Sequence, residues 1–356
     1  MAPRSESLGW NDEGVHDYGV FLHCSCSARH ADGRPPARRA TAHHAGRDLW
    51  GQDSSGHRRS ARDPSPRPHG QTCRGERMTA AAPSPLVLEW AARQLAVAEL
   101  RWVRSLPGGT HARTSVVGTP DGAEFVLRQF PPGDDAVRLE IRVLSTLGDL
   151  GELAPQLLAA DAEGTVNGCP LIVTTLLPGR ASITPTNPHD FARQLGAALA
   201  RIHSLAVIPG LTDLFTEPAT ESPMHSVWHQ LTGEPRVLTH NDFWSGNTVW
   251  LNERLTGIVD WSGAGRAPRG YDLAWCRQDL VFLYDVTVAD VFTRAYDQAF
   301  GSPTPDVALW DHFAAMKAYP RVETWAPNYT DLGRDDLDGA GLRRRLTEWM
   351  LRLDAG

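Results

Sequence analysis

The sequence predicts an α+β protein of two lobes, in which a small antiparallel sheet precedes a larger and mainly helical part. Three observations favour this class. The chain has 356 residues, more than one compact domain usually needs. Short alternating stretches between turn residues dominate up to residue 178, whereas helical periodicity dominates after it. We therefore expect an N-lobe over residues 78–178, a C-lobe over residues 179–356, and a ligand crevice between them.

The elements of the N-lobe follow from its turn signals. Pro-Gly-Gly at 107–109 and Thr-Pro-Asp-Gly at 119–122 are typical of tight turns. Gly148 is placed to end a helix, and Pro178-Gly179 ends the last strand. In order, the expected elements are a helix at 86–96, strands at 99–106, 113–118 and 124–130, a helix at 134–147, and strands at 155–160 and 170–177.

The C-lobe is expected to be mostly helical. Its clearest helix covers residues 188–205, and several more follow Asp272. Between them, residues 237–259 combine short apolar runs with polar turns, which predicts short strands and a loop.

Residues 1–77 differ in composition from the rest of the chain. They hold 12 arginines, nine acidic residues and seven of the 14 histidines, so this segment carries +3 and the rest carries −10. Its apolar residues are too few to offset the entropy of ordering, so we expect disorder, with Met78 as a candidate natural start. Cys24, Cys26 and His30 do not match the paired C-x-x-C spacing of zinc sites.

Composition argues against several classes of function. No apolar run reaches the roughly 20 residues that span a bilayer, and the N-terminus lacks the apolar segment of a secretory signal. Five cysteines, an odd number, do not suggest a disulfide framework. Acidic residues dilute the basic N-terminal segment, which argues against nucleic-acid binding. We expect a cytoplasmic protein with no membrane or nucleic-acid partner.

The motif with the most chemical information lies near the middle of the predicted C-lobe. His240, Asp242 and Asn247 form the pattern His-x-Asp-x-x-x-x-Asn, and Asp260 follows 13 residues later, after an apolar run and before a tryptophan. A catalytic Asp, a magnesium-binding Asn and a second metal-binding Asp in this order are the layout of phosphoryl-transfer sites. Magnesium prefers hard oxygen ligands, which Asn247 and Asp260 would supply from two segments. Asp242 would then face an acceptor hydroxyl.

This pattern resembles the aminoglycoside phosphotransferase and choline-kinase-like family, relatives of protein kinases that phosphorylate small molecules. The resemblance covers about residues 86–320. The family's loop reads His-Gly-Asp-x-x-x-Gly-Asn, and residues 240–247 differ from it by one filler glycine. The resemblance implies a protein-kinase-like two-lobe fold. It also implies that His240 and Asp272, the latter in Gly-Tyr-Asp-Leu-Ala, support the catalytic loop, and that His203 is a core residue of a helix.

The same resemblance assigns the nucleotide to the N-lobe. In this family a turn between the first two strands covers the phosphates, and Gly108, Gly109 and Thr110 occupy that position. The hinge after the last strand offers backbone groups to the adenine edge, so Thr175 and Leu177 are the expected contacts.

Arg128 takes the place of the lysine that the family usually carries on its third strand for the α- and β-phosphates. Lys317, far away, is the only lysine of the chain, and an arginine keeps the charge and can bind a phosphate bidentately. Independently, helical periodicity puts Glu140 near the middle of the apolar face of the helix at 134–147. A carboxylate there is costly to bury unless a cation meets it, so we expect a Glu140–Arg128 pair.

The main hypothesis is an enzyme, namely an ATP- and Mg²⁺-dependent kinase that transfers the γ-phosphate to a hydroxyl of a small molecule. Asp242 would orient or deprotonate this acceptor, Asn247 and Asp260 would hold Mg²⁺, and Arg128 with Glu140 would hold the phosphates. The resemblance allows aminoglycosides, macrolides, choline-like alcohols, sugars and homoserine as acceptors.

Two other functions stay open. One is a nucleotide-binding pseudokinase or regulatory module without transfer activity; the presence of every metal-binding and acceptor-facing group argues against it, and Arg128 in place of lysine is the feature that discriminates. Phosphorylation of protein side chains fits less well, because the stretch between Asp260 and Asp272 is too short for a long activation segment.

Overall fold

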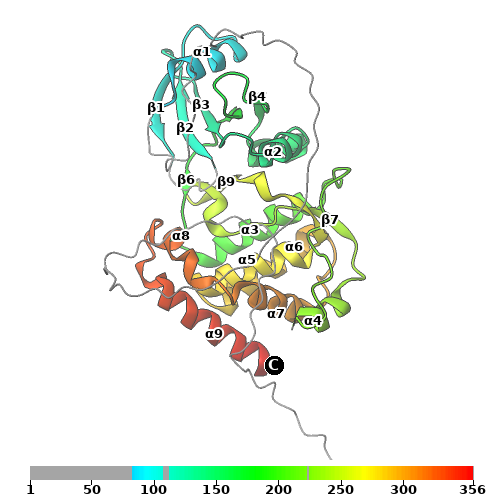
Figure 1. Ribbon diagram of the computed structural model, residues 1–356. Coiled ribbons are helices and arrows are strands. Elements are labelled where there is room, and N and C mark those ends of the chain that lie inside the picture. Colours follow the sequence, from blue (N-terminus) through cyan, green and yellow to red (C-terminus); the bar gives the residue numbers. More distant parts are fainter. Residues whose placement is uncertain (1–81, 107–111, 223, 356) are drawn as a thin grey trace, which may run out of the picture.

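The computed structural model describes residues 82–106, 112–222 and 224–355, and it consists of a sheet lobe stacked on a helical lobe (Figure 1). The predicted disorder of residues 1–77 and the weak metal pattern at Cys24, Cys26 and His30 concern residues outside this described part. The predicted phosphate turn, with Gly108, Gly109 and Thr110, also lies outside it.

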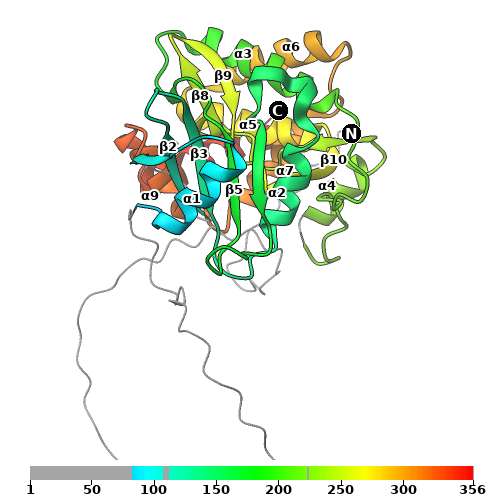
Figure 2. The ribbon, with the colours of Figure 1, turned by 90° about the horizontal axis from the view of Figure 1, so that it is seen from above.

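The sheet lobe contains a five-stranded antiparallel sheet with the order β1-β2-β3-β5-β4. The helix α1 (Pro85–Gln94) packs against one face of it, where Val87 and Trp90 share an apolar cluster with Leu127 (Figure 2). All five predicted strands of this lobe are confirmed, with ends shifted by two residues at most. They are β1 (Arg101–Ser105), β2 (Arg113–Gly118), β3 (Glu124–Gln129), β4 (Leu157–Asp161) and β5 (Leu171–Thr175).

The second helix of this lobe is shorter than predicted. The apolar pattern suggested a helix over 134–147, but α2 spans Ala136–Leu144, and a 3₁₀ turn (Leu147–Leu153) follows it. The hydroxyl groups of Ser145 and Thr146 donate to the carbonyls of Ile141 and Val143, at 2.7 and 2.8 Å. The N–H of Thr146 donates to the carbonyl of Val143, three residues back, so the bonding changes from the α-helical to the 3₁₀ pattern at this point.

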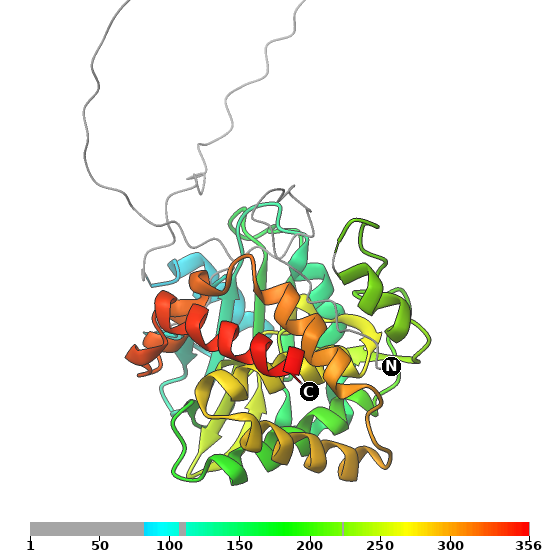
Figure 3. The ribbon, with the colours of Figure 1, turned by 90° about the horizontal axis from the view of Figure 1, so that it is seen from below.

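The helical lobe is built around α5, most of whose side chains are buried. Helix α3 begins after Asn187, whose side chain accepts from two N–H groups of the first turn, and it packs closely along α6. Helix α9 crosses the face of this lobe that is turned away from the sheet (Figure 3). No helix of the described ranges has the length and apolar content that crossing a membrane requires. The helices are α3 (Pro188–His203), α4 (Met224–Leu231), α5 (Gly270–Leu283), α6 (Val286–Phe300), α7 (Val307–Ala318), α8 (Ala326–Thr330) and α9 (Gly339–Ala355).

Five short strands lie between the sheet lobe and the helices. β8 and β9 form a hairpin whose turn residues, Asn252 and Glu253, both have positive φ (51° and 62°), as type I′ turns require. β6 pairs with β8, and β7 pairs with β10. Their bounds are β6 (Arg180–Ala181), β7 (Arg236–Thr239), β8 (Thr248–Leu251), β9 (Arg254–Ile258) and β10 (Gly265–Pro268). The predicted strands and loop of residues 237–259 are therefore present, and β7 leads directly into His240.

Candidate active site

The hairpin β8–β9 brings Asn247 and Asp260 together. Asn247 directly precedes β8, Asp260 follows β9 by two residues, and Thr248 pairs with Ile258 across the ladder. The N–H of Val259 donates to the carbonyl of Asn247 at 2.9 Å, which extends the pairing by one step. Two residues 13 positions apart in the sequence thus lie at the same end of one hairpin.

Asp242 is fixed by hydrogen bonds from two side chains. Asn247 Nδ2 donates to Asp242 Oδ2 at 3.0 Å and to its main-chain carbonyl at 2.9 Å. Trp275 Nε1 donates to Asp242 Oδ1 at 3.3 Å. The amide nitrogen of Asn247 is thus committed to Asp242, while its side-chain oxygen accepts no hydrogen bond within the described ranges and is available to a ligand.

The loop that carries Asp242 is anchored to α5 by two buried carboxylates. Asp272 Oδ2 accepts from the N–H of His240 at 2.6 Å, and Asp272 Oδ1 accepts from the N–H of Asn241 at 2.9 Å. Asp279 Oδ2 accepts from both the N–H of Ser245, at 2.9 Å, and its hydroxyl, at 2.5 Å. Seven residues separate the two carboxylates, which puts them two turns apart on one face of the helix.

His240 and His203 make structural contacts. His240 is fully buried, and its Nε2 lies 3.0 Å from the carbonyl of Val259, next to Asp260. His203 lies between Tyr296 Oη, at 2.8 Å from Nδ1, and Asp272 Oδ2, at 3.4 Å from Nε2. His203 therefore steadies the carboxylate that holds the loop.

Asn241 stands at the position where the loop of the family that the sequence resembles has glycine. The backbone conformation at this position explains the preference for glycine. Its φ is +71°, a left-handed conformation that asparagine tolerates better than other side chains with a Cβ. Tyr271 Oη donates to Asn241 Oδ1 at 3.1 Å, and Lys317 Nζ donates to the same Tyr271 Oη at 2.5 Å. Lys317 also lies over the rings of Tyr271 and Trp275, at 4.3 and 4.8 Å from their centroids.

Arg128 connects the sheet lobe to this site. Leu127 lies on the face of the sheet that α1 covers, and the side chain of Arg128 lies on the other face. Its guanidinium contacts the Glu140 carboxylate of α2 in a charge-assisted hydrogen bond. Its second terminal nitrogen lies 3.5 Å from Asp260 Oδ1. Only 2% of the Glu140 side chain is exposed, against 41% for Asp260. One arginine thus bridges a buried carboxylate and an accessible one.

Three carboxyl groups of this region have raised pKa values. Burial raises the pKa of Glu140 to about 7, with a further rise from Asp260, although Arg128 pulls in the opposite direction. Burial raises the pKa of Asp279 to about 6 despite the hydrogen bonds it accepts. Burial and the nearby Asp260 carboxylate raise the pKa of Asp242 above its ordinary value. Perturbed acids that gather in one place are a feature of functional sites.

The two residues predicted at the hinge lie at the edge of this region. Thr175 ends β5, and its N–H donates to the carbonyl of Gln156 at 3.0 Å. Leu177 is buried against β9, since a Cβ at Gly257 would lie 2.2 Å from its Cδ1. The N–H of Leu177 makes no hydrogen bond in the part of the chain that the structure describes.

Sequence reasoning missed four residues that shape this site, namely Tyr271, Trp275, Asp279 and Lys317. A signal was available for two of them, because Trp275 and Asp279 follow Asp272 by three and seven residues and so share its face of the helix. Nothing in the sequence marks Lys317 as a partner of Tyr271, 46 residues away.

The sheet lobe, the helical lobe and the loop that carries Asp242 define a protein-kinase-like fold. A model of the phosphotransferase enzyme family matches residues 102–224 and 223–310, more than half of the chain, and the chain belongs to this family. The homoserine kinase of Xanthobacter autotrophicus is 26% identical over 193 residues, which cover 44% of this chain. The match spans only 58% of the length of that relative.

Solved structures show the same fold. A Ralstonia eutropha structure assigned to the aminoglycoside phosphotransferases is 17% identical, with a TM-score of 0.54, and covers 76% of this chain and 97% of its own. An amicoumacin kinase solved with AMP-PNP and Ca²⁺ is 14% identical, with a TM-score of 0.50, and covers 75% of this chain and 93% of its own. At these identities the likeness establishes the fold, which confirms the predicted α+β, two-lobe, protein-kinase-like class.

Proposed function

We propose that the protein is an ATP- and Mg²⁺-dependent kinase that transfers the γ-phosphate to a hydroxyl of a small molecule. The observation that carries this proposal is the convergence of Asp242, Asn247 and Asp260 at one end of the β8–β9 hairpin, with Arg128 reaching it from the sheet lobe. Phosphoryl transfer needs positioning and charge neutralisation rather than covalent help, and these residues supply both.

The donor set fits magnesium. The free side-chain oxygen of Asn247 and the accessible carboxylate of Asp260 are hard oxygen ligands, the type that Mg²⁺ prefers. When bound, the metal would neutralise charge on the β- and γ-phosphates. Arg128 would donate to phosphate oxygens, and Glu140 would keep the guanidinium in place.

Asp242 is the proposed catalytic residue. Its raised pKa makes it a better proton acceptor for an alcohol, and the bonds from Asn247 and Trp275 fix the orientation of its carboxylate. His240 and Asp272 are positioning residues, because they hold the loop without reaching the acceptor.

The nucleotide base would bind at the hinge. The N–H of Leu177, which has no partner among the described residues, and the backbone of Thr175 are proposed to contact the adenine edge. Gly108, Gly109 and Thr110 remain the proposed phosphate turn. The proposed division into lobes at residue 178 assigns these groups to the N-lobe and Asp242 to the C-lobe.

The test measures ADP release by the full chain in the presence of a panel of hydroxyl acceptors. The panel contains homoserine, aminoglycosides, macrolides, choline and sugars. Asp242→Ala should abolish transfer and leave ATP binding within about twofold, because Asp242 acts at the acceptor. Asp331→Ala, an exposed aspartate of the helical lobe, is the matched control and should behave as wild type. Retained turnover in Asp242→Ala would refute the assignment.

A regulatory module that binds nucleotide is the second candidate. Arg128 in place of lysine is the observation that favours it. Saturable ATP binding with no phosphorylated product from any acceptor of the panel would support the module over the kinase.

A further inference from the structure

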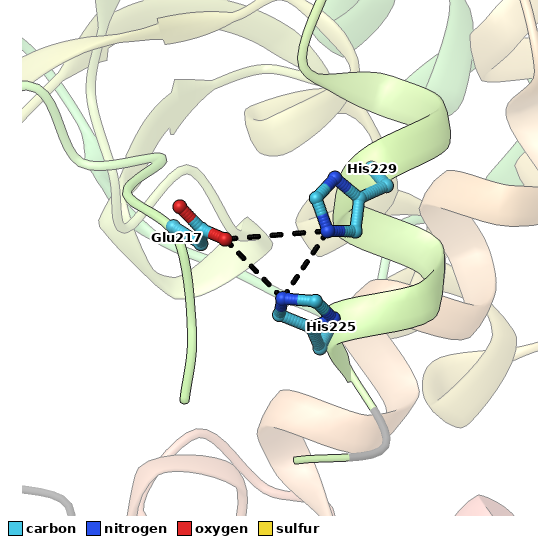
Figure 4. A group of neighbouring side chains, drawn as sticks. All are labelled: Glu217, His225 and His229. Atoms are coloured by element: carbon cyan, nitrogen blue, oxygen red, sulfur yellow. Dashed lines mark hydrogen bonds and ion pairs between the residues drawn. The ribbon is translucent and has the colours of Figure 1, made fainter. Parts of the chain in front are cut away.

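A cluster of three metal-ligating side chains lies outside the candidate active site, where the chain enters α4. His225 and His229 stand one helical turn apart on α4, and Glu217 belongs to the segment that precedes this helix (Figure 4). The two imidazoles and the carboxylate point toward one another from two different segments.

The distances in this cluster match those between ligands of a bound metal ion. His225 Nε2 lies 3.2 Å from His229 Nε2 and 3.2 Å from Glu217 Oε1, and His229 Nε2 lies 4.0 Å from the same oxygen. A point equidistant from these three atoms lies about 2.1 Å from each of them. Zinc binds imidazole nitrogen and carboxylate oxygen at about 2.0–2.2 Å, so its tetrahedral ligands stand about 3.4 Å apart. The two 3.2 Å separations are close to this value, and the 4.0 Å separation has to close by about 0.6 Å when an ion binds.

Hydrogen bonding alone accounts poorly for the convergence. Two imidazole nitrogens and one carboxylate oxygen lie within 4.8 Å of one another, and a single N–H proton on one imidazole can donate well to only one of the other two atoms. A cation at the centre would satisfy all three lone pairs at once.

We propose that Glu217, His225 and His229 form a binding site for a divalent transition-metal ion of the zinc type. Neutral imidazole nitrogens select such ions over magnesium, which prefers oxygen. Three protein ligands leave one tetrahedral position for water. The side chains of Glu217 and His229 are 56% and 54% exposed, so an ion can reach the site from solvent.

The bound ion would fasten the segment before α4 to the helix itself. Phe215, two residues before Glu217, packs against Trp310 and Phe313 of α7, with ring centroids 5.0 and 5.2 Å away. It also contacts Tyr271, whose hydroxyl holds Asn241. The metal site therefore stabilises the edge of the core that supports the catalytic loop, and it does not depend on the proposed phosphotransfer.

The test is a zinc titration of the full chain in competition with a chromophoric chelator. Wild type should bind one Zn²⁺ through this cluster, and His229→Ala should lose at least tenfold in affinity. Glu217→Gln should weaken binding in the same direction. His189→Ala removes an exposed histidine elsewhere and should bind zinc as wild type does. Saturating zinc should raise the melting temperature of wild type by about 5 °C and leave that of His229→Ala unchanged.

Cobalt substitution separates this site from the cysteine- and histidine-bearing N-terminal segment. Co²⁺ bound by two imidazoles and a carboxylate gives visible d–d bands without a thiolate charge-transfer band, and these bands should be absent from His229→Ala. Equal zinc affinity in wild type and His229→Ala would overturn the proposal. A cobalt spectrum that shows thiolate ligation alone would overturn it as well.

Discussion

The Glu140→Gln substitution should change how folding stability depends on pH, because this carboxyl group is buried in the folded protein and hydrated in the unfolded chain. Its pKa is about 7 in the folded state, against an ordinary value of 4.5 for a hydrated glutamate. The folded state therefore holds the proton more tightly, and its contribution to stability is present below pH 4.5 and lost as the pH rises through 7. The full loss is about 3 kcal/mol, of which about 2 kcal/mol falls between pH 5.5 and 8.

The measurement compares urea unfolding of wild type and Glu140→Gln at pH 5.5 and 8, followed by tryptophan fluorescence. Glutamine does not titrate, so the difference in unfolding free energy between the two proteins should shift by about 2 kcal/mol in favour of the variant at the higher pH. Glu152→Gln, an exposed glutamate beyond α2, is the control and should show no such shift. A difference between wild type and Glu140→Gln that is the same at both pH values would refute the reasoning.

The same substitution should weaken ATP binding. Arg128 loses its buried anion and is left with Asp260, at 3.5 Å, as its remaining ion-pair partner. We expect the KM for ATP to rise several-fold, while the stability of the variant relative to wild type increases from pH 5.5 to pH 8. A carboxylate that serves ligand binding but is costly to bury should behave in this way, because its removal weakens binding and also removes the cost of burying the charge.

Three further predictions test the anchoring of the catalytic loop and of the hinge. Trp275→Phe removes the hydrogen bond to Asp242 Oδ1 but keeps an aromatic ring; because this bond lowers the pKa of Asp242, the acidic limb of the kcat–pH profile should move to higher pH, with the KM for ATP unchanged. Tyr329→Phe removes the hydroxyl that donates to buried Asp279 Oδ1 at 2.9 Å, and should cost about 1–3 kcal/mol in urea unfolding, because the carboxylate that holds Ser245 loses a partner; a cost near zero would contradict that role. Gly179→Ala combines a φ of +112° with a Cβ 2.2 Å from the carbonyl oxygen of Trp250, and should cost more than about 2 kcal/mol, whereas Gly122→Ala, with a φ of +97° and open space around it, should cost about 1 kcal/mol.

Local patterns predicted much of the fold and part of the site. The strands of the sheet lobe were predictable because alternation and turn residues act over a few positions. Glu140 was predictable because a charge on an apolar helical face needs a partner, and Arg128 is in contact with it. The end of α2 was predicted three residues too late, because the apolar pattern continues to Leu147 although the backbone changes to 3₁₀ bonding at Thr146.

The anchoring residues on α5 were harder to predict for a physical reason. Almost every side chain of this helix is buried, so it has no polar face whose exceptions would be noticed. Asp279 and Trp275 gain their roles from a loop more than 30 residues away in sequence, which neither helical periodicity nor local turn chemistry describes.

The geometry of the candidate site rests on backbone groups rather than on the identity of the loop residues. Asp272 and Asp279 accept from three main-chain N–H groups of the loop, and any non-proline residue supplies such a donor. Loop side chains are therefore constrained only where φ is positive or where the side chain itself touches the site. Asn241, at +71°, fulfils the first condition in place of a glycine, and Asp242 and Asn247 fulfil the second. Burial disfavours the ionised form of Asp279, so the buried carboxylate lowers the free energy of unfolding above about pH 6. At neutral pH the rigidity of the site is therefore gained at the expense of the stability of the fold.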